Sequence, residues 1–466
     1  MAQTYEEILQ MLKETMIRRC DKTAFVSICA LIYFLPISIA LVEWFVALPV
    51  LCFCIKKLIE VVFRIYEAGK NKVRKDKIRY CLKGFLPVNN FLAASVMAYA
   101  VVCFLSIFVS SYPQLSTRAF FGKILERVFL FFVFVESVNT EKRIKRFSLI
   151  LFISAGLICI NGLYQSVFAQ GFIRGFSMME GRLTSTFNHP NDFATYLLLP
   201  TLIIFNFLLS DLFLNNKTEK RKSRYAGLIR YAFIFLFVIC VLNFALTFSR
   251  GAYFGALFAL VFMWVFKYCK LKAILVSAAL FLIGFSPVMA KMRNVSLISD
   301  AVHKNKIVSK INITEKDKQN EILTMGMGRI GFWKEALTSI SRKPILGTGL
   351  NTYSKEAQKR GNWTGFYAHN CYLQMAAEIG LVGLGSFLWM LFILFKRACD
   401  RSIVIKDRYL LILFHGVLSG LVGFLVHSFL DTSFYSLQLN TLFWVVLGLS
   451  VSIMQVDNSG LKRKMS

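Results

Sequence analysis

Four polar clusters interrupt a mostly apolar sequence, and each contains a residue that can bind or activate a substrate. They centre on Arg182, Arg250, Arg329 and His369. The clusters span residues 181–191, 246–251, 328–333 and 367–370. Arginine carries a permanent charge on a planar fork of donors that suits phosphate oxygens, and histidine can accept a proton near neutral pH. Together these residue types point to chemistry on a phosphate-bearing substrate.

A sugar linked to a lipid diphosphate fits these residues. A diphosphate at a membrane surface needs at least two cationic partners, and Arg182, Arg250 and Arg329 offer three. A histidine such as His369 suits the base that removes a proton from a sugar hydroxyl. The predicted reaction is therefore transfer of a sugar with the diphosphate as leaving group, which requires neither an enzyme nucleophile nor a metal.

Each of these residues also has a plainer interpretation. Arg182 and Arg329 can be interfacial anchors that reach toward headgroups, and a single loop histidine is more often structural than catalytic. Arg250 is harder to explain in this way, because it lies in a very short connection between long apolar stretches, where an arginine is costly unless it faces a partner or water. His189, beside Pro190, indicates a turn or a helix start.

Two further groups of ionisable residues lie inside apolar stretches or at their ends. His427 and Asp431 are four residues apart and hence on one helical face, where they either orient the site or close a helix end. Lys123, Glu126 and Arg127 share a face of another stretch. They either help to hold the diphosphate or form a structural ion pair.

Twelve apolar stretches of roughly 18–25 residues make up most of the chain, and each can cross the ~30 Å of a bilayer core as a helix. The 466 residues are 56% hydrophobic and only 17% charged, and the stretches do not alternate as a membrane barrel requires. We therefore predict an all-α polytopic membrane protein with about 12 transmembrane helices, the first two separated by a tight connection near Glu43. The predicted spans are 24–40, 43–59, 91–110, 119–138, 147–168, 191–213, 231–248, 251–267, 271–290, 371–395, 408–430 and 437–455.

Lysine and arginine concentrate in one set of short connections, with ten of them in 56–83. Such connections stay in the cytoplasm, so both termini are predicted to be cytoplasmic and all four polar clusters external. The net charge of +29 has the same explanation and does not indicate nucleic-acid binding. The eleven cysteines show no metal-site spacing. The predicted segments are a cytoplasmic N-terminal segment 1–23, spans in 24–290, an extracytoplasmic loop 291–370, spans in 371–455 and a cytoplasmic tail 456–466.

The long external loop, 291–370, has two different parts. Its Lys-rich first part includes His303, which we interpret as incidental. In the second part, apolar residues recur at helical spacing over 330–340 and predict an amphipathic helix that ends near Lys343. Residues 352–360 predict another short helix. Such helices lie on or in the membrane surface.

At these clusters the sequence resembles the O-antigen ligase and polymerase superfamily of bacterial envelope polysaccharide enzymes. The most specific part of the resemblance lies in Arg329–Trp333, Pro344–Gly349, Ala368–Gln374 and Glu378–Gly383. Arg182–Asn191 and Thr247–Gly251 match motifs upstream of these. The resemblance covers roughly residues 180–450, and the first 170 residues match only as a series of spans.

The resemblance implies a GT-C-like fold and a glycosyl transfer without metal or cofactor on the external face of the bacterial inner membrane. The donor would be a glycan on undecaprenyl diphosphate, and a ligase would move it to lipid A-core. His369 would be the catalytic base, Arg250 and Arg329 would bind the diphosphate, and Arg182 would line the same pocket. Possible supporting residues are Ser249, Tyr367, Asn370 and Asp431.

Several functions stay open at this point. A polymerase of the same superfamily would join the glycan to another lipid-linked repeat unit, and relatives also glycosylate proteins. A polysaccharide or lipid transporter without catalysis is the alternative from another class. A transporter would be expected to carry broken helices with charged residues near the middle of the membrane, whereas the polar clusters here lie at its outer surface.

Overall fold

Helices make up the fold of this protein in the computed structural model, which describes residues 2–70, 90–210, 224–266, 328–360, 367–402 and 405–464. Within these ranges no strand is formed, and seven helices are long and apolar enough to cross a bilayer. Two shorter apolar helices, α4 and α11, accompany them. The prediction of an all-α polytopic membrane protein is confirmed.

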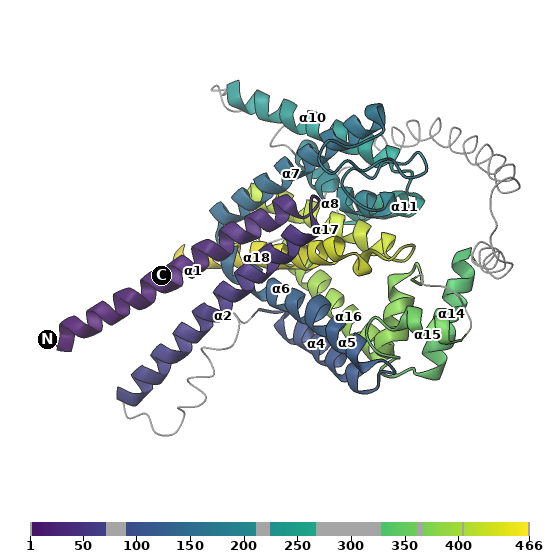
Figure 1. Ribbon diagram of the computed structural model, residues 1–466. Coiled ribbons are helices and arrows are strands. Elements are labelled where there is room, and N and C mark those ends of the chain that lie inside the picture. Colours follow the sequence, from purple (N-terminus) through teal and green to yellow (C-terminus); the bar gives the residue numbers. More distant parts are fainter. Residues whose placement is uncertain are drawn as a thin grey trace, which may run out of the picture.

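Figure 1 shows how the described helices are arranged in space. Their bounds are α1 Ala2–Phe34, α2 Ile39–Lys70, α4 Ala93–Phe108, α5 Pro113–Ala119, α6 Glu126–Ser137, α7 Glu141–Phe168, α8 Pro190–Leu209, α10 Arg224–Leu246, α11 Arg250–Val265, α14 Gly328–Arg342, α15 Tyr353–Lys359, α16 Cys371–Ser402, α17 Arg408–His427 and α18 Leu437–Lys464. A π-helical turn, Phe120–Leu125, joins α5 to α6, and a 3-10 turn, Ser433–Tyr435, precedes α18.

Eleven of the twelve predicted spans coincide with these helices, and the two short helices of the long loop appear as α14 and α15. The predicted ninth span, 271–290, lies outside the described residues, and so does His303. The N-terminal segment 1–23 is not separate from the first span, because α1 runs through both without a break.

The turn between α1 and α2 lies earlier than predicted. α1 ends at Phe34 and α2 begins at Ile39, so the turn contains Pro36, and Glu43 lies inside α2. The prediction of a connection near Glu43 was therefore wrong. A single acidic residue does not end a helix. Proline lacks the N–H that a helical hydrogen bond needs, which favours a turn at Pro36, although α2 accommodates Pro49.

Close helix packing holds the centre of the bundle together. α17 packs between α8 and α11, and glycines allow two of the backbones to approach closely. A Cβ at Gly255 of α11 would lie only 2.5 Å from the carbonyl oxygen of Gly423 in α17. Small residues at such crossings let membrane helices pack by van der Waals contact. Phe424, Phe434 and Phe443 fill the adjoining core with ring centroids 4.8–6.0 Å apart.

The two ends of the bundle differ. Figure 1 shows both termini toward one end of the molecule and α14 and α15 at the opposite end. The polar clusters meet at the end that carries α14 and α15, which we call the site end.

Candidate active site

His369 lies in a tight turn immediately before α16 and has a left-handed backbone, with φ of 48°. Asn370 fixes the helix start, because its side-chain oxygen accepts the N–H groups of Tyr372 and Leu373 at 3.0 Å. Asn370 is thus a helix cap that supports the His369 turn. The side chain of His369 is 35% exposed and lies beside the ring of Phe332, with centroids 5.7 Å apart. Strained backbone of this kind persists only where the surroundings hold it.

Asp431 is the carboxylate that His369 faces. His369 Nδ1 lies 3.5 Å from Asp431 Oδ1, which also accepts the N–H of Thr432 at 2.8 Å. Burial raises the pKa of Asp431, but its hydrogen bond with His369, the charge of His427 and the Thr432 N–H together hold that pKa below its usual range. Asp431 is therefore ionised at neutral pH and can stabilise a protonated imidazole at position 369.

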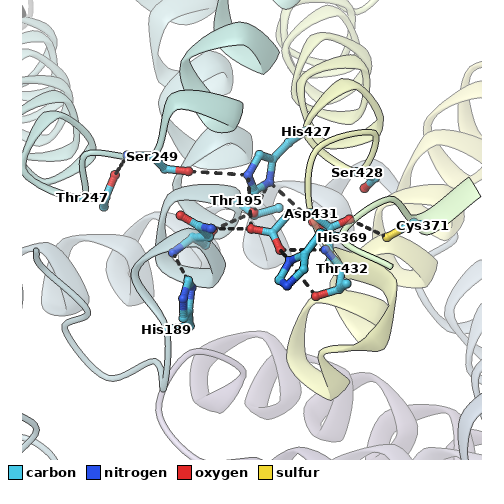
Figure 2. Close-up of polar contacts among 12 residues, drawn as sticks. His189, Thr195, Thr247, Ser249, His369, Cys371, His427, Ser428, Asp431 and Thr432 are labelled. Atoms are coloured by element: carbon cyan, nitrogen blue, oxygen red, sulfur yellow. Dashed lines mark hydrogen bonds and ion pairs between the residues drawn. The ribbon is translucent and has the colours of Figure 1, made fainter. Parts of the chain in front are cut away.

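His427 is a buried support for the site. Figure 2 shows Asp431 between His427 and His369. His427 is 1% exposed, its Nδ1 lies 2.6 Å from the hydroxyl of Thr195, and its Nε2 lies 3.5 Å from that of Ser249. The gap of 3.9 Å between His427 Nε2 and Asp431 Oδ2 is too long for a hydrogen bond, so the predicted proximity holds but the pair is not hydrogen-bonded. Ser249 contacts this support.

Arg182 braces the loop that carries the first polar cluster. Its Nε donates to the carbonyl of Thr247 at 2.8 Å, and one terminal nitrogen donates to Asn191 Oδ1 at 2.6 Å. Asn191 Nδ2 in turn donates to Asp431 Oδ2. Arg182 thus reaches the carboxylate beside His369 through one intervening side chain. Part of its donor set is used by the protein, so it is less available to a ligand than the prediction assumed.

Arg250 and Arg329 are arranged differently. They occupy the first turns of α11 and α14, and both are exposed. Neither guanidinium forms a hydrogen bond or ion pair with another residue in the described parts of the chain. Arg250 lies within electrostatic range of Arg182, and Arg329 within range of His427. Two uncompensated cations at helix N-termini form a favourable environment for an anion.

Other predicted residues lie around this centre. Tyr367 is partly exposed and packs on Tyr435 with ring centroids 5.1 Å apart. His189 caps the start of α8, as predicted, and its Nδ1 accepts the N–H of Asn191 at 3.2 Å. Burial lowers the pKa of His189, which favours this neutral, accepting form. His189 therefore supports Asn191 in its contact with Asp431.

The group on the fourth span is divided between two roles. Arg127, which is 1% exposed, forms an ion pair with Glu126 at 2.9 Å, so the structural interpretation is confirmed for these two. Lys123 lies on the π-helical turn, and its Nζ donates to Asn351 Oδ1 at 3.1 Å. It therefore fastens the fourth span to the segment between α14 and α15.

Sequence reasoning assigned no individual role to three residues of the site. Asn191 and Thr195 hold Asp431 and His427, and Glu378 is linked through Gln374 to the His369 turn. Glu378 carried a usable signal, because an ionisable residue inside an apolar helix usually has a function. Within the described residues no group of three or more His, Cys, Asp or Glu side chains could hold a metal ion. Metal-free transfer stays a prediction.

Comparison with known proteins supports the resemblance seen in the sequence. Residues 235–388 match a family model described as O-Antigen ligase. A ComP-specific O-oligosaccharyltransferase from Acinetobacter baylyi (strain ATCC 33305 / BD413 / ADP1) is 27% identical over 331 residues, which are 68% of this chain. The chain spans about half of that relative, 53% of its length. The family match contains Arg250, Arg329 and His369, whereas Arg182 and Asp431 lie outside it and are added to the site by the structure.

Proposed function

Because the chain is similar to the O-antigen ligase superfamily both in its motifs and over the matched segment, we propose that it is a ligase-type membrane glycosyltransferase. It moves a glycan from undecaprenyl diphosphate to lipid A-core on the external face of the inner membrane. The observation that carries the proposal is the contact of His369 with Asp431 at the same end of the bundle as Arg250 and Arg329, two arginines without a partner among the described residues.

The geometry supports a single displacement at the sugar. His369 takes the proton of the acceptor hydroxyl, and the acceptor oxygen attacks the anomeric carbon of the donor. The bond from that carbon to the diphosphate oxygen breaks, and the diphosphate leaves with the electron pair. Arg250 and Arg329 bind the negative charge that develops on the leaving group, and Asp431 stabilises the imidazolium. No step in this sequence needs a metal.

The proposed orientation follows from the basic residues. The short connections rich in Lys and Arg belong with the termini, and Figure 1 places the termini opposite α14 and α15. Positive residues in short connections favour the cytoplasm, which puts the termini inside and the site outside. A cysteine placed at exposed Arg342 of α14 should react with a membrane-impermeant maleimide in intact cells. Labelling that occurs only after the cells are lysed would contradict this orientation and place α14 in the cytoplasm.

Transfer to a protein acceptor is a second candidate, favoured by one observation. The matched relative is named as an O-oligosaccharyltransferase specific for ComP. Only the acceptor differs between the two proposals, since the hydroxyl of a protein side chain can be activated by His369 as readily as that of a sugar.

The test is a transfer assay with purified full-length protein in lipid nanodiscs, an undecaprenyl-diphosphate-linked glycan and EDTA. Three acceptors are offered in parallel: lipid A-core, a second lipid-linked repeat unit and the protein ComP. Product on lipid A-core supports the ligase proposal. Product on the lipid-linked unit alone identifies a polymerase, and product on the protein alone identifies a protein glycosyltransferase. A donor that is left intact with all three acceptors contradicts catalysis and favours a transporter.

A further inference from the structure

α16 is interrupted at Gly380, where φ is 74° and ψ is 178°. The loop between α14 and α15 packs against α16 at this interruption. Gly349 N–H donates to the Glu378 carbonyl at 2.8 Å, and Leu381 N–H donates to the Pro344 carbonyl at 2.7 Å. Only glycine fits here, because a Cβ at position 380 would lie 2.0 Å from a backbone oxygen of this loop. The break thus joins α16 to the segment that leads from α14.

The Glu378 side chain sits beside the break and is 3% exposed. Its two oxygens accept the N–H groups of Asn351 at 2.9 Å and Tyr353 at 3.3 Å. They also accept Gln374 Nε2 at 3.2 Å and the Tyr435 hydroxyl at 3.1 Å. A buried carboxylate is expensive unless donors satisfy it, and here four donors from three parts of the chain do so. Glu378 connects segments that are otherwise distant in sequence.

One of these connections leads to the backbone of His369. Gln374 donates to Glu378 with its Nε2 and accepts the N–H of Ala368 with its Oε1 at 2.9 Å. Ala368 directly precedes His369, whose left-handed conformation must be held by its surroundings. A carboxylate only accepts hydrogen bonds, so Glu378 turns the NH₂ group of the Gln374 amide toward itself. The amide oxygen then faces Ala368 and anchors the His369 turn.

The other connections lead to the groups that His369 works with. Tyr435 belongs to the 3-10 turn that follows Asp431. Tyr353, whose N–H is bound by Glu378, donates its hydroxyl to the carbonyl of Phe332 at 2.8 Å. Phe332 lies in α14 three residues after Arg329 and packs on the ring of His369. A single carboxylate is therefore linked to the base, its partner carboxylate and a predicted diphosphate ligand.

We propose that Glu378 is a positioning residue for the transfer reaction. It sets the placement of His369 relative to Asp431 and to the start of α14, and does not touch the substrate. The inference rests on the proposed function, because it assumes that His369 acts as the base. A displacement of about 1 Å in a catalytic group can cost on the order of 10²-fold in rate.

The test compares three variants with the wild type in the transfer assay described above. Glu378→Gln places an amide NH₂ among four donors and should lower kcat about 10²-fold, with the KM for the lipid-linked donor changed less than about 3-fold. Gln374→Glu places two carboxylates side by side and should also lower kcat. In the double variant Gln374→Glu/Glu378→Gln, the new glutamate can accept both the Ala368 N–H and the new amide. We expect the double variant to recover about tenfold over the product of the two single losses.

Two controls separate positioning from loss of folding. Rates are expressed per folded molecule, measured by size-exclusion chromatography and thermal unfolding. Ser386→Ala removes a buried hydroxyl of α16 that donates to the carbonyl of Gly383 in the same helix, and should leave kcat unchanged. A merely structural role for Glu378 predicts losses that follow the folded fraction and show no recovery in the double variant.

The outcomes distinguish this inference from the function on which it rests. Two results would overturn the positioning role alone, provided that His369→Ala is inactive. One is a wild-type kcat in Glu378→Gln. The other is a loss in the double variant that equals the product of the two single losses. A wild-type protein that transfers glycan to none of the three acceptors, or an active His369→Ala variant, overturns the proposed function and this inference with it.

Discussion

Two clusters of charge, toward opposite ends of the bundle, differ in whether their cations have protein partners. Toward the end with the termini, Lys56 lies 2.8 Å from both Asp21 and Glu136, and Lys57 lies 3.2 Å from Glu136 and 3.3 Å from Glu60. At the site end, Arg250 and Arg329 have no such partner among the described residues.

The difference teaches how to interpret a basic residue in this protein. A buried cation that is paired on several sides contributes to the fold, because removing one partner leaves an uncompensated charge. An exposed arginine without a partner among the described residues is available to bind an anion. The Lys56 cluster, Asp21, Lys56, Lys57, Glu60 and Glu136, should therefore respond to substitution in stability, and the site end in activity.

The largest effect is expected at His369. His369→Ala removes the base and should lower the rate of transfer about 10³-fold, or about 4 kcal/mol at 1.36 kcal/mol per decade, with little change in thermal stability. The measurement is transfer of a labelled glycan from the lipid-linked donor. The matched control is His303→Ala, which should transfer at the wild-type rate. Equal rates for the two variants would remove His369 from the chemistry.

The next effect is expected in the Lys56 cluster and concerns stability. Glu136→Ala removes the carboxylate that Lys56 and Lys57 share and should cost about 3 kcal/mol of the free energy of unfolding. Thermal unfolding in detergent measures it, and Glu136→Gln should lose less because it keeps the shape and one acceptor. Transfer per folded molecule should not change. If Glu136→Ala lost much of its transfer activity per folded molecule but kept its stability, the Lys56 cluster would belong to the activity and not to the fold.

A somewhat smaller effect on activity is expected at Arg329. Arg329→Ala should lower kcat/KM for the lipid-linked donor about 10²-fold, or about 2.7 kcal/mol, because one cation at the leaving diphosphate is lost. Arg342→Ala is the matched control, since Arg342 is an exposed arginine at the other end of the same helix. Similar losses in both variants would point to the folding of α14 rather than to the diphosphate.

Most of the fold could be predicted from the sequence, because a span of apolar residues long enough for the bilayer has few alternatives to a helix. The exceptions are local. The turn after α1 contains Pro36 and lies earlier than Glu43, and Gly380 breaks α16 inside a predicted span. Composition does not reveal such points, because they depend on single residues and on the backbone that packs against them.

The site was predictable in its residue types but not in its contacts. Arginine and histidine stand out in an apolar sequence, so Arg250, Arg329 and His369 could be selected with a role in view. The contact between Asn191 and Asp431 joins residues 240 positions apart and depends on how α8 packs against α17. Helix packing, which no local pattern encodes, also determines that Arg182 bonds to the protein on two sides.

The smallest effect is expected for an exposed ion pair, which shows whether pairing or burial makes the Lys56 cluster important for stability. Glu141 and Lys145 form an ion pair four residues apart at the start of α7, with side chains 51% and 39% exposed. Exposed pairs of this kind contribute about 0.5 kcal/mol, since water screens the charges and ordering the side chains costs entropy. Glu141→Gln should therefore shift thermal unfolding by far less than Glu136→Ala and leave transfer unchanged. If the two glutamate variants lost equal stability, pairing alone would explain the Lys56 cluster, and burial could no longer be the reason that its cations belong to the fold.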